Sequence, residues 1–256
     1  MRLPETKDFI VDWLKHYAKS NNTKSFIIGI SGGIDSSLTS TLCALTGIKT
    51  VVVSLPIHQK KNELDNATAH AKWLMHTHKH VCFENIELTS VFEKYKETIP
   101  SKFHSSLNLA NSRARLRMTT LYQIAAKLNG IVVGTGNKIE DFGIGFFTKY
   151  GDGGVDISPI ADLTKSEVKK LADFCGIIKN IINAEPTDGL WEDGRTDESQ
   201  IGATYSELEW AFQYNGKKRL TKRETEVLSI YQELHEKNRH KMQPIPVCCI
   251  PDTLRN

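Results

Sequence analysis

The chain has 256 residues, of which 39% are hydrophobic and 25% are charged, and its formal net charge is +3. This length suits one substantial α/β domain, and the composition is that of a globular protein without a membrane span. A net charge of +3 is too small to indicate nucleic-acid binding. Asp8, Asp12 and Lys15 interrupt the N-terminal segment, which is therefore expected to be an amphipathic helix and not a signal peptide. We expect one domain over residues 1–256, in the cytoplasm, with neither a membrane nor a nucleic acid as partner.

Short apolar runs of strand length alternate with helical patterns along the chain. Strands are predicted at 26–30, 50–56, 80–88 and 130–134, and helices at 61–75, 89–98, 106–129, 164–175 and 221–241. The spacing of a capping box marks three helix starts, at Ser90 with Glu93, Thr164 with Glu167, and Thr221 with Glu224. The alternation predicts an α/β fold: a doubly wound, mostly parallel sheet with helices on both faces.

The sequence FIIGISGGIDSS at residues 26–37 predicts a phosphate-binding turn between a strand and a helix. Small residues follow the strand, so backbone N–H groups and the positive end of the helix dipole converge on one anion. The turn lacks the Gly-Lys-Ser/Thr of a Walker A loop and the GxGxxG of a dinucleotide-binding turn. Asp35 stands in place of that lysine, and a carboxylate beside phosphates implies a divalent cation between them.

A second charged stretch, residues 134–167, follows another predicted strand. Glu140 comes soon after a Gly-Thr pair, charged side chains surround a GDGG turn, and Lys165 begins the next helix. Ligands bind parallel sheets at the carboxyl ends of the strands, so this stretch and the phosphate-binding turn should meet in one cleft. Its charges beside glycines suit a site for phosphates, a metal ion and a polar ligand.

These motifs resemble a known family. SGGIDSS is similar to the pyrophosphatase loop of enzymes that split ATP into AMP and pyrophosphate. The ammonia-dependent NAD synthetases share further segments in the same order over residues 26–241: LPIHQ, NSRARLRM, VVGTGNKIE, GFFTKYGDGGVD, LTKSEV, PTDGLW, TDESQIGATY and NRHKM. The resemblance implies a ligase that amidates deamido-NAD with ammonia at the expense of ATP, the last step of NAD biosynthesis.

The resemblance also implies a role for each site residue. Asp35 and Glu140 would hold Mg²⁺, and ATP cleavage requires such carboxylates on chemical grounds as well. ATP would contact Gly29, Ile30, Ser31, Gly32, Gly33, Ile34, Asp35, Ser36, Thr135, Lys165 and Thr187. Deamido-NAD would contact Arg115, Lys149, Asp156, His240 and Lys241. Without the resemblance, His240 and Lys241 are more simply the frayed end of a helix, and Arg115 fits a solvated or interface face equally well.

The implied reaction activates a carboxylate by adenylation. The nicotinate carboxylate attacks the α-phosphate of ATP and pyrophosphate leaves into the glycine loop; ammonia then attacks the nicotinyl-adenylate and releases AMP. Lys165 would assist as a fixed cation, and Asp152 is the candidate acid that takes the proton of ammonium. The acidic segment 185–200 is either a lid over the adenylate or a plain exposed connector.

The chain departs from the family pattern at three places. One extra residue follows Glu140 before FFTK, Ser54 stands where many members have arginine, and Met242 stands where arginine often follows. None of these departures touches the metal or phosphate groups. The resemblance further implies a homodimer with substrate sites at the subunit boundary, and the length leads us to expect no separate glutaminase domain.

Two other functions compete with this interpretation. One is another adenylating member of the loop superfamily, such as a tRNA-modifying enzyme, although the chain has no basic appendage. The other is a non-catalytic ATP-binding sensor, which would not need the acidic pair Asp35 and Glu140.

Overall fold

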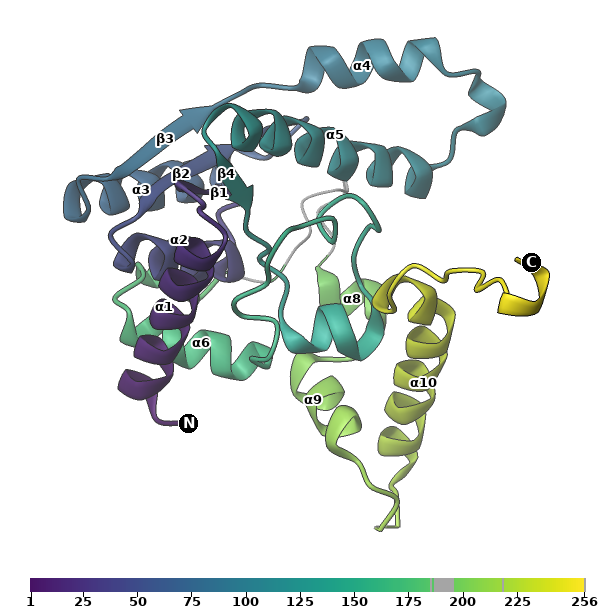
Figure 1. The fold of residues 1–256 in the computed structure, drawn as a ribbon. Coiled ribbons are helices and arrows are strands. Elements are labelled where there is room, and N and C mark those ends of the chain that lie inside the picture. Colours follow the sequence, from purple (N-terminus) through teal and green to yellow (C-terminus); the bar gives the residue numbers. More distant parts are fainter. Residues whose placement is uncertain (185, 187–195, 218, 256) are drawn as a thin grey trace.

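The computed structural model of the chain describes all residues except 185, 187–195, 218 and 256. At its centre is a parallel sheet in the order β3-β2-β1-β4 (Figure 1), made of β1 (Ser25–Gly29), β2 (Lys49–Ser54), β3 (Val81–Asn85) and β4 (Gly130–Val132). Ile27 of β1 pairs with Val51 on one side and Val132 on the other. The predicted α/β fold is confirmed, although β3 and β4 are shorter than predicted.

Helices cover both faces of the sheet, because successive side chains of a strand point in opposite directions (Figure 1). Phe26 and Ile28 pack on one face against α1 (Leu3–Ser20), α2 (Ile34–Leu45) and α6 (Lys165–Phe174). Val52, next to Ile28, packs on the same face against α3 (Lys61–Thr77). Ile27 faces the other way, toward α5 (Ser106–Lys127) and α4 (Thr89–Thr98).

A second, smaller core lies beside the sheet and its helices (Figure 1). Its members are the π-helix η2 (Ile139–Ile144), α8 (Asp197–Ile201), α9 (Tyr205–Gln213) and α10 (Lys222–Met242). The short elements η1 (Ser101–Phe103), α7 (Lys179–Ile182) and η3 (Asp252–Leu254) complete the described secondary structure. Sequence patterns did not predict η2, α8 or α9. Among the described residues, no helix combines the length and apolar character that crossing a membrane requires.

Two of the three predicted capping boxes are present in the structure, and the third is not. Those of α6 and α10, at Thr164 and Thr221, are both present. The one predicted at Ser90 is wrong, because α4 already begins at Thr89 and has no capping side chain at its preceding residue. The Glu87 carboxylate accepts a hydrogen bond from the Thr89 amide at 2.9 Å, and Glu93 is bonded to His58 instead. The capping-box spacing therefore identified the helix start at Thr164 and Thr221. It failed at Ser90, where Glu93 bonds to a side chain from another segment.

A π-helix spans the segment after Glu140, where one residue more than in the family pattern is predicted. Glu140 and Asp141 lie in its first turn, and Gly145 ends it in the left-handed conformation with φ of +60°. A π-helix uses more residues per turn than an α-helix and often occurs at functional sites. A turn of this kind has room for one residue more than an α-helical turn, which is the excess over the family pattern predicted for this segment.

Candidate active site

The phosphate-binding turn lies between β1 and α2, as predicted. Gly33 is the residue before α2, and Asp35 falls in the first turn of that helix. The turn is held by its own hydroxyl groups: the Ser36 hydroxyl donates to the Gly33 carbonyl, and the Gly33 amide donates to the Ser31 hydroxyl at 3.2 Å. This conformation leaves the amino end of the helix facing the carboxyl edge of the sheet, where anions are favoured.

Both the backbone conformation at position 32 and the close approach of α3 require a glycine there. Its φ is +85°, a value that side chains with a Cβ rarely adopt. A Cβ built on Gly32 would lie 2.4 Å from the Glu63 carbonyl oxygen of α3. The turn therefore packs directly on α3, and no larger residue fits at this position without displacement of backbone.

Asp35 and Glu140 meet at one ammonium group, that of Lys165. The Lys165 Nζ lies 2.6 Å from Asp35 Oδ2 and 3.0 Å from Glu140 Oε1. The three side chains are only 11–17% exposed. These residues, which we call the acid site, come from α2, η2 and the first position of α6. The two sequence motifs thus meet as expected: Asp35 lies beside Glu140 and Lys165, each more than 100 residues away in the sequence.

Two further side chains fix the carboxylates, and sequence patterns missed both. The buried Asn137 amide donates to Asp35 Oδ1 at 3.2 Å, while its carbonyl accepts from the Ile139 and Glu140 amides. The Tyr205 hydroxyl, at the start of α9, donates to Glu140 Oε1 at 2.5 Å and lies 3.2 Å from Asp197 Oδ2. The Lys165 ammonium also lies 4.7 Å from the centre of the Tyr205 ring. A helix from the second core thereby contributes directly to the acid site.

The site shifts the protonation of all three charged groups. Burial raises the pKa of the Asp35 carboxyl, and the Lys165 ammonium only partly offsets this. Burial acts on Glu140 too, but Lys165 and the Tyr205 hydroxyl outweigh it and lower the pKa of Glu140. Burial favours the neutral amine of Lys165, yet the two carboxylates outweigh that effect and raise its pKa. Lys165 is therefore held as a cation.

Further acids lie close to the acid site. Burial, followed by repulsion from Glu140 and Asp152, raises the pKa of Asp141 to about 8. Asp152, the predicted proton acceptor, is exposed, and its Oδ1 accepts a hydrogen bond from the Thr148 amide at 3.0 Å. Repulsion among these acids opposes their simultaneous ionisation, and a bound cation would relieve it.

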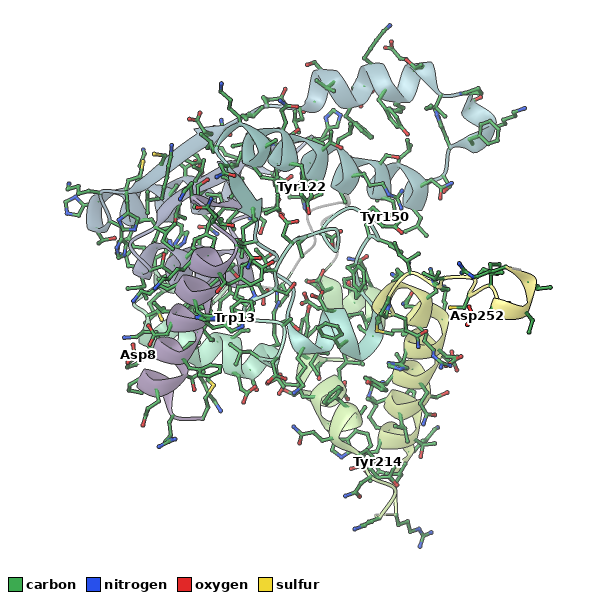
Figure 2. The ribbon with its side chains drawn as sticks, viewed as in Figure 1. Asp8, Trp13, Tyr122, Tyr150, Tyr214 and Asp252 are labelled. Atoms are coloured by element: carbon green, nitrogen blue, oxygen red, sulfur yellow. The ribbon has the colours of Figure 1, made fainter. Side chains whose placement is uncertain are left out.

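Three basic residues predicted to contact the substrate lie together between α5 and α10. The Arg115 Nε donates to the Lys149 carbonyl, and the Lys149 Nζ donates to the His240 carbonyl at 3.0 Å. The Lys241 Nζ donates to the Phe147 carbonyl at 2.7 Å. We call Arg115, Lys149 and Lys241 the basic cluster. Tyr150, which follows Lys149 in the chain, is labelled in Figure 2. His240 takes part through its carbonyl.

Other predicted site residues have different surroundings. Asp156 uses both carboxylate oxygens within the chain: Oδ2 accepts from the Val132 amide at 2.7 Å and Oδ1 from the Tyr122 hydroxyl at 2.9 Å. It thereby ties β4 to α5 (Tyr122 is labelled in Figure 2). Thr135 follows β4, beside the carboxyl end of β1. Thr187 and most of the predicted lid lie outside the described residues.

The neighbours of Arg115 on α5 are engaged inside the chain. The buried Arg113 guanidinium lies 5.4 Å from the centre of the Phe92 ring, and Arg117 donates to the Leu55 carbonyl and to Gln59. A solvated arginine face on this helix, one of the alternatives from sequence, is therefore wrong for these two residues. Arg117 thereby also holds the LPIHQ segment, residues 55–59, and Ser54, which immediately precedes this segment, is buried.

The acid site fits a divalent cation such as Mg²⁺. Its donors are carboxylate oxygens, the ligands this ion prefers, and two of them already approach one positive group. Among the described residues, no three or more His, Cys, Asp or Glu side chains gather as a metal cage. Two protein carboxylates suit Mg²⁺, which usually completes its coordination with water and substrate phosphates.

Comparison with known proteins connects this geometry to a family. The NAD synthase family model matches residues 7–245. The NH3-dependent NAD+ synthetase of Alkaliphilus metalliredigens is 37% identical over 249 residues, which cover 93% of this chain and 96% of the relative. The structure of NMN synthetase from Francisella tularensis has a TM-score of 0.87 and 30% identity, over 98% of this chain and 100% of that one.

A third comparison agrees. The NH3-dependent NAD synthetase from Campylobacter jejuni has a TM-score of 0.79 and 25% identity, over 97% of this chain and 100% of that one. The family predicted from the motifs is confirmed: this chain belongs to the NAD synthase family, a family of ligases.

Proposed function

We propose that this chain catalyses the ATP-dependent amidation of deamido-NAD by ammonia, giving NAD, AMP and pyrophosphate. The observation that carries the proposal is the meeting of Asp35 and Glu140 on the Lys165 ammonium, next to the glycine turn. A phosphate nest beside two carboxylates suits a metal-bound triphosphate. The curated relative from Alkaliphilus, similar over 93% of this chain, supports the choice of acceptor.

In the proposed reaction, the residues of the turn from Gly29 to Ser36, with Thr135 and Thr187, bind ATP. Mg²⁺, when bound at Asp35 and Glu140, supplies Lewis-acid stabilisation of the phosphates. Lys165 adds a positive charge near the breaking bond, which stabilises the negative charge of the leaving pyrophosphate. The nicotinate carboxylate becomes a nicotinyl-adenylate, a mixed anhydride that ammonia can attack.

The basic cluster is proposed to bind the anionic substrate, and Asp156 and His240 are proposed as further substrate contacts. Lys149 and Lys241 donate to backbone carbonyls, so their positive charges are positioned without neutralisation by those partners. A cation held in this way attracts substrate phosphates. Asp152 is proposed to accept the proton of ammonium, because desolvation raises the pKa of its carboxyl and makes the carboxylate a stronger base.

The direct test is incubation of the purified protein with ATP, Mg²⁺, ammonium and deamido-NAD, followed by quantification of AMP and NAD. We expect both products in equal amounts. ATP bound without turnover would favour the non-catalytic sensor. AMP formed only with a tRNA acceptor would favour the tRNA-modifying enzyme.

A second candidate acceptor is nicotinate mononucleotide. The Francisella protein is named an NMN synthetase, and it exceeds the Campylobacter NAD synthetase in both TM-score and identity to this chain. The two acceptors share the nicotinate carboxylate and differ in the adenylate half. The ratio of kcat/KM for the two acceptors decides between them, and we expect the dinucleotide to have the higher value.

The proposal includes a homodimer in the cytoplasm. A substrate that contains two nucleotides has a second half to bind, and a subunit boundary offers additional surface for it. Light scattering during size exclusion should give twice the mass of one chain. The mass of a single chain would remove the dimer from the proposal and leave the chemistry of the acid site intact.

A further inference from the structure

The Lys165 ammonium lies where a cation shared by both carboxylates would lie. It is within 2.6 Å of Asp35 and 3.0 Å of Glu140, and its side chain is only 11% exposed. Among the described residues, the other side chains that donate to these carboxylates are neutral: the Asn137 amide and the Tyr205 hydroxyl. Lys165 is therefore the charged partner on which the two acids converge.

A divalent ion bound to these two carboxylates would compete electrostatically with this ammonium. Mg²⁺ requires oxygen ligands at about 2.0–2.1 Å in a nearly octahedral shell. The ammonium already occupies one oxygen of each carboxylate, Asp35 Oδ2 and Glu140 Oε1. Both groups are positive, so they repel one another at such short distances.

Lys165 is built so that its ammonium can move while its backbone stays. The capping box of Thr164 and Glu167 fixes the start of α6, and the Ser166 amide and hydroxyl both donate to Glu209 of α9 at 2.7 Å. The charge sits at the end of a flexible four-carbon chain. The triphosphate of ATP offers that charge an alternative anionic partner beside the glycine turn.

We propose that Lys165 is an exchangeable internal counter-ion that holds Asp35 and Glu140 together before nucleotide binds and yields them to the divalent cation when triphosphate arrives. The inference rests on the proposed metal role of the two carboxylates. It goes further by making metal entry depend on the movement of one side chain. Nucleotide and metal then bind cooperatively, each raising the affinity for the other by the same factor.

The test is a titration of nucleotide-free protein with Mn²⁺, followed by electron paramagnetic resonance of the free ion. We expect Lys165→Met to bind Mn²⁺ about tenfold tighter than the wild type, because the competing ammonium is gone. Lys165→Arg keeps the positive charge and should bind as weakly as the wild type. Lys170→Met, an exposed lysine on the same helix, is the matched control and should not change the affinity.

A further variant assigns the effect to the acid site. Adding Glu140→Gln to Lys165→Met should abolish the gain in Mn²⁺ affinity. Lys165→Gln is a second neutral variant should Lys165→Met fold poorly, as judged by circular dichroism. Unchanged or weaker Mn²⁺ binding in a folded neutral variant would overturn the exchange.

The same titrations separate this inference from the proposed function. Wild-type protein that forms NAD with Mg²⁺, together with a folded neutral variant of unchanged Mn²⁺ affinity, would overturn only the exchange. Wild-type protein that forms NAD equally well after complete removal of divalent ions would overturn the metal role and the exchange together.

Discussion

Lys165 of the acid site and Lys149 of the basic cluster carry the same functional group in opposite surroundings. Lys165 lies between two carboxylates and is nearly buried. Lys149 donates to the His240 carbonyl, and in the part of the chain that the structure describes neither Lys149 nor Lys241 forms an ion pair. Burial, only partly offset by Asp152, lowers the pKa of Lys241.

The difference shows how one fold prepares two kinds of electrostatic site. In the acid site the charges of the protein compensate one another, so a ligand must exchange with an existing partner. In the basic cluster backbone dipoles orient the cations, so an anion can bind without displacing a carboxylate. The first arrangement suits a metal-bound triphosphate, and the second suits an anionic acceptor.

The largest effect should come from removing one acid-site charge. Glu140→Gln keeps the shape of the side chain but removes one of the two carboxylates proposed to hold the metal. We expect kcat to fall about 1000-fold, equivalent to about 4 kcal/mol of transition-state stabilisation. Initial rates of AMP formation measure this fall in kcat. Glu97→Gln, at an exposed position on α4, is the control. A variant within tenfold of the wild type would show that the acid site is not catalytic.

The next prediction concerns the pH dependence of folding stability, through a buried histidine that packs behind the predicted phosphate-binding turn. His70 of α3 is fully buried, 2.9 Å from the Ser40 hydroxyl of α2, and burial lowers its pKa to about 4. Below pH 6.5 the His70 imidazole binds a proton in the unfolded chain, whereas in the folded chain it stays neutral until the pH approaches 4. The contribution of His70 to the free energy of unfolding is thus complete above pH 6.5. It declines by about 3 kcal/mol as the pH falls toward 4.

Urea unfolding at pH 7 and pH 4.5 measures this pH dependence. His70→Gln should lose much of the decline, whereas His76→Gln, at an exposed position on the same helix, should retain it. If the two variants and the wild type lost stability in parallel, His70 would not be the group responsible.

The basic cluster should respond less strongly than the acid site, and in a different parameter. Lys149→Met removes an oriented cation, and a hydrogen bond to a charged group contributes about 2 kcal/mol. We expect kcat/KM for the acceptor to fall about 30-fold, mainly through KM, with little change in KM for ATP. Lys94→Met on α4 is the control. A loss confined to kcat would place Lys149 in the chemical step and blur the contrast between the two sites.

The smallest effect should come from the link between the acid site and the second core. Tyr205→Phe keeps the ring beside Lys165 but removes the hydroxyl that donates to Glu140. We expect kcat to fall about fivefold, equivalent to about 1 kcal/mol. Tyr95→Phe, at an exposed position on α4, provides the comparison. Wild-type kcat in Tyr205→Phe would mean that Lys165 and Asn137 alone position Glu140.

Several features follow from the sequence without any coordinates. The alternating pattern determined the parallel α/β fold, and SGGIDSS determined a tight turn between a strand and a helix, with Asp35 at the start of the helix. Even the meeting of Asp35 with the Glu140 segment was predictable, because parallel strands end at a common edge. These features depend on contiguous residues or on a general rule of topology.

Other features were decided only by the tertiary structure. The contact of Tyr205 with Glu140 joins residues 65 positions apart through α9, a helix that sequence patterns did not predict. The use of Asp156 as a tie between β4 and α5, and the π-helix around Glu140, also carry no local signal. Periodicity reports which side of an element is buried, but not which polar groups from distant segments satisfy one another there. Those pairings arise only when the two cores pack together, and they determine how the acid site is charged.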